Sequence, residues 1–137
     1  MKRDDDLLRE LMLEIVDDPM PTKFYRFFHQ PSEEEQKREC HVGLLRDNQF
    51  VAFKNERLEP YGKGGTSLQG RRQIRSLEVT ATNSGHDFLE AIRDNTIWNS
   101  TKTAVAEIGG GATLDIIKRL AIGLLKTKIE KHTGIAL

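Results

Sequence analysis

The chain has a single cysteine, Cys40, so it cannot form a disulfide within itself. This usage fits a reducing compartment. The chain also has no excess of charge of either sign, because 21 Lys and Arg residues balance 21 Asp and Glu residues. A basic surface for nucleic acid would therefore need local segregation of charge. The most apolar stretch, 114–125, is broken by Asp115, Lys118 and Arg119. We therefore expect no membrane span and no signal peptide, and a cytoplasmic location.

Motifs for catalysis and for cofactors are scarce as well. The four histidines form no HExxH pair and no Cys/His spacing typical of zinc. The segment Gly62-Lys63-Gly64-Gly65 resembles a phosphate-binding loop only superficially, because that motif has four residues between its two glycines and places its lysine directly after the second one. We predict no catalytic residue, no metal site and no cofactor, and we do not expect an enzyme.

What the chain does contain is a clear succession of elements. Apolar spacing predicts a first helix over 4–16, and an aromatic run predicts a short strand over 24–28 that could pair with a later hairpin. Ser32, with Glu35 three residues on, predicts a capped second helix that ends at Asn48 in the left-handed conformation. Strands are predicted at 50–53 and 74–80 around a glycine-rich tip at 58–70, and further helices over 83–105 and 113–131.

This order of helix, hairpin and helix predicts an α+β, mainly α fold. We assign 1–107 to a winged helix-turn-helix-like domain and 108–137 to a C-terminal helical extension that packs or dimerises. The last helix carries apolar residues on more than one face, which favours a homodimer. The alternative is a helix clasped inside the monomer.

The predicted hairpin is the most basic part of the chain. Between positions 54 and 75 it has six basic residues against two acidic ones, namely Lys54, Arg57, Lys63, Arg71, Arg72 and Arg75 against Glu56 and Glu59. Such a wing could lie along phosphates, where each neutralised phosphate releases a counterion. It could equally be a solvated hairpin whose charges prevent edge-to-edge aggregation.

The predicted Ser32–Asn48 helix is less suited to DNA. Its first turn holds Glu33, Glu34 and Glu35, which would repel phosphates at the end that commonly enters the groove. Basic residues further along could still reach a base or a phosphate. The other interpretation is a packing helix with ordinary solvated charge.

Several segments resemble a family of small uncharacterised bacterial and prophage-encoded proteins. The opening Met1-Lys2-Arg3-Asp4 with Asp6-Leu7 is similar, and so is the stretch from Gly85-His86-Asp87-Phe88-Leu89 to Trp98. The resemblance covers nearly the whole chain. It implies a shortened winged helix in which the Ser32 helix takes the recognition position, and it implies no defined function.

Two functions are therefore carried forward. The first is a DNA-binding winged-helix protein, a bacterial or phage transcriptional regulator that contacts double-stranded DNA. Its candidate nucleic-acid-binding residues are Arg38, His41, Arg46, Arg57, Lys63, Arg71 and Arg72. The second is a non-enzymatic protein-interaction module, for a phage or host partner, on the same scaffold.

Overall fold

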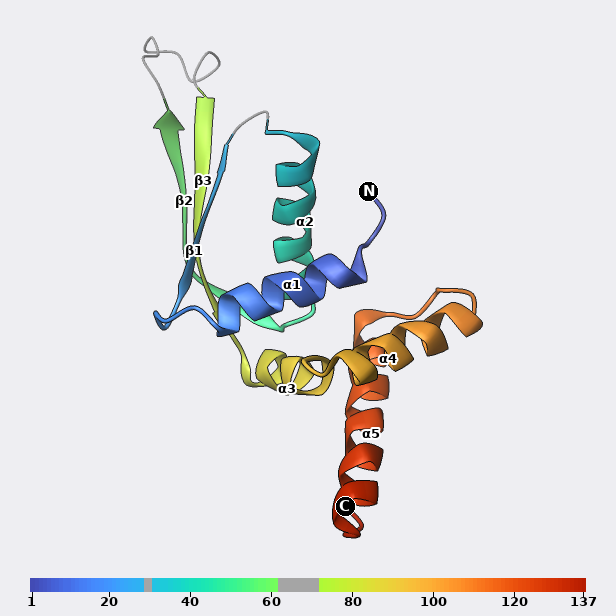
Figure 1. Ribbon diagram of the computed structural model, residues 1–137. Helices are drawn as coiled ribbons and strands as arrows, with labels where there is room; N and C mark the ends of the chain where they lie inside the picture. Colours follow the sequence, from blue (N-terminus) through green and yellow to red (C-terminus); the bar gives the residue numbers. More distant parts are fainter. Residues whose placement is uncertain (29–30, 62–71) are drawn as a thin grey trace. The chain divides into compact units, whose positions relative to one another are not determined.

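The computed structural model describes residues 1–28, 31–61 and 72–137, with only the backbone of Tyr61 and Arg72. Within these ranges it is an α+β, mainly helical structure with five helices and one three-stranded antiparallel sheet (Figure 1). The predicted class is confirmed at this level. The elements are α1 Asp5–Val16, β1 Lys23–Phe28, α2 Glu33–Asp47, β2 Val51–Tyr61, β3 Arg72–Ala81, α3 Asn83–Ile92, α4 Asn95–Glu107 and α5 Leu114–Thr133.

The chain divides into two compact units, Met1–Thr82 and Asn83–Leu137. The first unit holds α1, α2 and the sheet, and the second holds α3, α4 and α5. This division differs from the predicted boundary between 107 and 108. The reason is that α5 packs against both α3 and α4, so the last helix belongs with the two before it and is not a separate extension.

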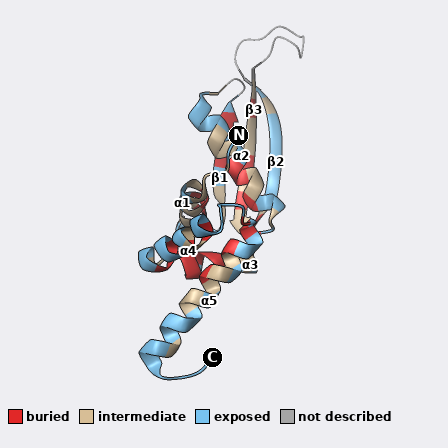
Figure 2. Ribbon diagram, turned by 90° about the vertical axis from the view of Figure 1, so that its right-hand side faces the viewer, coloured by how far each residue is buried: buried red, intermediate tan, exposed pale blue. Residues whose placement is uncertain are grey.

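The sheet has the strand order β1-β3-β2, with both pairs antiparallel. The predicted pairing of the aromatic strand with the hairpin is thus confirmed. Side chains alternate between the two faces of the sheet. The buried face carries Tyr25, Phe27, Leu77 and Val79, and α1 and α2 pack on this side (Figure 2). We call the opposite side the outer face.

Side-chain caps start the helices of the first unit where the sequence predicted. The Asp4 carboxylate accepts the Leu7 N–H at 3.1 Å, and the Ser32 hydroxyl accepts the Glu35 N–H at 3.2 Å. The end of α2 differs from the prediction, because Asn48 has a φ of −90° and Gln49 takes the left-handed conformation at 63°. The left-handed turn therefore lies one residue later than predicted, and it lets the Phe50 N–H donate to the Leu45 carbonyl at 2.9 Å, while the Asn48 side-chain N–H donates to the Leu44 carbonyl at 2.8 Å.

The single helix predicted over 83–105 is wrong, because the structure has two helices there. The helical conformation is interrupted at Arg93 and Asp94, between α3 and α4. The Asp94 carboxylate accepts the N–H groups of Thr96 and Ile97 and so starts a new helix. The prediction missed this break because it joined the apolar residues up to Ile92 and from Ile97 into one helix, although five positions separate the two isoleucines.

Helix α5 is capped by Thr113 and ends at Gly134, whose φ is 72°. It buries Leu114, Ile117 and Ala121, while Ile116 and Ile129 are exposed. The predicted homodimer through residues 108–137 stays a prediction. In the described ranges, no helix has the length and apolar character needed to cross a membrane.

Candidate functional site

One carboxylate, that of Glu14 on α1, joins three elements of the first unit. Its Oε1 atom accepts the Tyr25 hydroxyl at 3.1 Å and the Arg38 guanidinium at 2.7 Å. Burial raises the pKa of Tyr25, and the negative charge of Glu14 adds to the effect. Burial would lower the pKa of Arg38, but the hydrogen bond to Glu14 and the charges of Glu14, Tyr25 and Glu10 together outweigh it, and the pKa is raised. The guanidinium that was predicted to read DNA thus holds α2 to α1.

A second group of charges lies between α2 and the hairpin, and we call Glu39, Arg46, Glu56 and Arg75 the helix–hairpin ion cluster. Arg75 donates to Glu56 at 2.8 Å and to Glu39 at 3.1 Å, and Arg46 lies 3.9 Å from Glu56. Both guanidinium groups also lie over the Phe53 ring, at 4.7 Å for Arg46 and 5.9 Å for Arg75. Arg75 of the predicted wing and Arg46 of the predicted DNA-contacting helix are therefore paired with the protein's own carboxylates.

His41 lies in the core of the first unit and is 0% exposed. Its Nε2 accepts the Asp4 backbone N–H at 2.8 Å, and its Nδ1 lies 2.7 Å from the Lys37 carbonyl oxygen. The first bond requires an unprotonated Nε2, so Nδ1 carries the proton and donates a hydrogen bond to the Lys37 carbonyl. This burial argues against the predicted DNA contact.

The outward face of α2 is also not basic. Glu33, Gln36, Cys40 and Asp47 share one side of the helix by their spacing, and all four are exposed. A helix placed in a major groove needs donors and cations on the side that meets the DNA. This face carries two carboxylates instead.

The remaining predicted site residues belong to the hairpin. Arg57 is exposed on β2, and no ion pair to it occurs among the described residues. Lys63 and Arg71 lie outside the described residues, as does the side chain of Arg72. The structure therefore does not bring the seven predicted residues together on one described surface.

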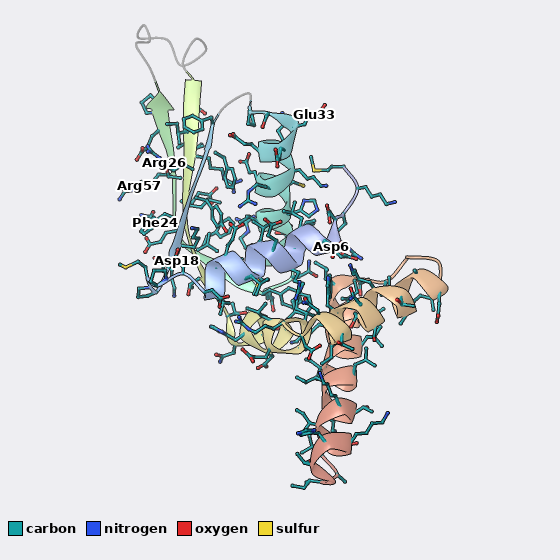
Figure 3. All side chains as sticks on the ribbon, in the orientation of Figure 1. Asp6, Asp18, Phe24, Arg26, Glu33 and Arg57 are labelled. Atoms are coloured by element: carbon teal, nitrogen blue, oxygen red, sulfur yellow. The ribbon has the colours of Figure 1, made fainter. Side chains whose placement is uncertain are left out.

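The outer face of the sheet holds a group of residues that sequence reasoning did not single out. Antiparallel partners across the strands share a face, and this places Phe24, Glu78 and Asn55 in one row and Arg26, Ser76 and Arg57 in the next. We call these six residues the Phe24 face. Figure 3 shows Phe24, Arg26 and Arg57 on the side of the sheet away from α1 and α2.

Phe24 is 65% exposed although it is a large aromatic residue on a regular strand. A shallow hollow of about 260 Å³ lies beside it, also lined by Asn55, Arg57 and Glu78. Arg26 lies 4.0 Å from Glu59, so charges of both signs surround the hollow. The alternation of Phe24, Arg26 and Phe28 against buried Tyr25 and Phe27 is the sequence signal that could have revealed this face.

The described residues offer little to a metal ion. Nowhere in residues 1–28, 31–61 and 72–137 do three or more His, Cys, Asp or Glu side chains gather as ligands. The outer face can contact another molecule through its apolar, guanidinium and carboxylate groups.

Comparison with known proteins places the chain among uncharacterised relatives. An uncharacterised protein of Haemophilus influenzae is 27% identical over 132 residues, which are 88% of this chain and 92% of the relative. No solved structure matches. The predicted resemblance to a family of unknown function is confirmed in this coarser form. A family described as "Hypothetical protein (DUF2513)" matches residues 2–112, which is most of the chain, and the protein therefore belongs to that family.

Proposed function

We propose that residues 1–82 form a shortened winged helix that serves as a protein-interaction module. The element order α1–β1–α2–β2–β3 supports the winged-helix assignment, with a single helix before the hairpin and β1 paired beside β3. Because one fold can serve many functions, the choice of function depends on the surfaces. The Phe24 face is the docking surface in this proposal.

The exposure of Phe24 carries the proposal. Phe24 is 65% exposed and lies beside a hollow, so a bound partner could remove its apolar surface from water, which is favourable. Aromatic residues and arginine are the types enriched at protein interfaces, and lysine is depleted there. The Phe24 face has one phenylalanine, two arginines and no lysine.

The chemistry of the hollow defines the partner. Phe24 offers an apolar contact, and Arg57 offers a guanidinium on the same side of the sheet. We infer a protein partner that places an apolar side chain against Phe24 and a carboxylate against Arg57. A polyanion fits less well, because Glu59 and Glu78 also line the hollow and would repel phosphates.

Binding to double-stranded DNA, as a bacterial or phage transcriptional regulator, remains the second candidate. One observation favours it: Lys54 and Arg57 are exposed on β2, the strand that precedes Lys63 and Arg71 in the sequence. Against it stand the ion pairs of Arg38, Arg46 and Arg75 within the protein.

Photo-crosslinking tests the docking surface. A benzophenone amino acid replaces Phe24 in one version of the protein and Leu58 in another, in the cells that make it. Leu58 is the matched control because it is 67% exposed but lies in the row of Phe27, on the opposite face. We expect a discrete crosslinked protein from position 24, lost on Arg57→Glu, and none from position 58. Equal products from both positions, or none from position 24, would contradict the proposal.

A duplex titration separates the two candidates. If the protein-interaction proposal is right, random duplex binds no tighter than about 10⁻⁴ M at physiological salt. Tighter binding that loses about one unit of salt slope for each of Lys63→Ala and Arg71→Ala would favour DNA instead.

A further inference from the structure

The second unit contains a groove of about 540 Å³ between α4 and α5. Its floor is apolar, formed by buried Ile97 on α4 and half-buried Leu124 on α5. An open hollow with an apolar floor between two helices is a site that a further helix can fill with its apolar stripe. The groove lies within residues 83–137 and is independent of the Phe24 face.

The α5 side of the groove carries positive charge. Lys128 and Lys131 line it together with His132. Lys128 is bound to the Asp94 carboxylate, which also caps α4, so its charge is already compensated. Lys131 is exposed and pairs with no carboxylate in the described part of the chain. Its charge therefore remains available to an anionic group placed over the groove.

The α4 side of the groove carries no charge. Thr96 and Ser100 present hydroxyl groups there, while the Thr127 hydroxyl on α5 donates to the Gly123 carbonyl at 3.0 Å. The hydroxyl groups of Thr96 and Ser100 can donate hydrogen bonds to a carboxylate without repelling it. The groove thus combines an apolar floor, neutral hydroxyl donors and a basic rim.

From this combination we propose that the α4–α5 groove binds an acidic amphipathic helix of another protein. The apolar stripe of that helix covers Ile97 and Leu124, and its carboxylates face Lys131 and His132. A nucleic acid fits the rim but leaves the apolar floor uncovered. A second copy of α5 fits less well, because its own exposed Lys126 and Lys131 would repel the rim.

The experiment uses the full-length protein and a synthetic probe. The probe is a labelled helix of about four turns, with Leu in one stripe and Glu at the flanking positions. A second peptide has Lys in place of Glu, and a third has the composition of the first in an order without a stripe. Fluorescence anisotropy measures binding. We expect the acidic amphipathic peptide to bind at least about tenfold more tightly than either of the others.

Charge reversal in the protein locates the site. Lys131→Glu is expected to weaken binding of the acidic peptide about tenfold. Lys126→Glu makes the same charge change on an exposed residue of α5 that does not line the groove, and it should have an effect of less than about threefold. Circular dichroism confirms that both variants remain folded.

Three outcomes would overturn the proposal: no binding of the acidic peptide, equal binding of the basic or unstriped peptide, or equal loss from Lys126→Glu and Lys131→Glu. A fourth is dimerisation that disappears with Lys131→Glu, measured by analytical ultracentrifugation, since it would assign the groove to a second copy. Each of these results is independent of crosslinking at position 24.

Discussion

The two faces of the sheet treat similar side chains in opposite ways. On the helix side, Phe27 is 5% exposed and Arg75 is bound to two carboxylates. On the outer face, Phe24 is 65% exposed, and Arg57 has no ion pair among the described residues. Residue type therefore does not decide the role of a side chain here. The role depends on the face of the sheet to which the side chain points, because α1 and α2 cover one face and solvent covers the other.

The sharpest test of this contrast is the pair Phe27→Ala and Phe24→Ala. Phe27 fills the core, so its truncation leaves a cavity and should lower the free energy of unfolding by about 3–5 kcal/mol. Phe24 makes its apolar surface available to solvent, so its truncation should change stability by less than about 0.5 kcal/mol. Urea unfolding followed by circular dichroism measures both. Similar losses would show that the outer face is structural.

A smaller but still large effect is expected at His41. Alanine removes the imidazole ring, which leaves the partly buried Asp4 N–H and Lys37 carbonyl without their hydrogen bonds to His41. We expect a loss of about 2–3 kcal/mol in the free energy of unfolding. The control is Cys40→Ala, the exposed neighbour, with a change below about 0.5 kcal/mol. A His41→Ala protein of normal stability would contradict the structural role of His41, and the prediction that His41 contacts DNA would have to be considered again.

The two arginines provide a third comparison. Arg75→Ala breaks the bonds that tie Glu39 of α2 to Glu56 of β2, and it should cost about 1–2 kcal/mol after allowance for its partial exposure. Arg57→Ala should be neutral to within about 0.5 kcal/mol. Thermal unfolding of both variants checks this. If Arg57→Ala cost as much as Arg75→Ala, Arg57 would be a structural residue and a weak docking candidate.

The smallest effect concerns pH. Burial raises the pKa of Tyr25, and Glu14 raises it further, so the folded chain keeps this proton at a pH where an unfolded chain, with a pKa of about 10, loses it. The free energy of unfolding should therefore fall as the pH rises above about 10. Tyr25→Phe should remove that part of the slope. Unfolding measured between neutral and alkaline pH tests this, and an unchanged slope in Tyr25→Phe would rule it out.

Local signals explain which elements could be predicted. The caps at Asp4, Ser32 and Thr113 act within four residues, so sequence spacing identifies them. The break at Asp94 was missed, although its side chain is an equally good cap, because the apolar residues on both sides of it were assigned to one helix. At the candidate site, the exposure of Phe24 could have been predicted from strand alternation. The pairing of Arg38 with Glu14 could not, since 24 residues separate them.

By itself, the sequence determined the kinds of element, their order and most of their ends, because propensity, capping and periodicity are short-range effects. Only the tertiary structure decided which charges are free. Glu14, Glu39 and Glu56 come from three different elements, and packing brings each one next to an arginine. A guanidinium held by a neighbouring carboxylate no longer offers its charge to a partner. A count of basic residues along the chain therefore overstated the surface available to DNA.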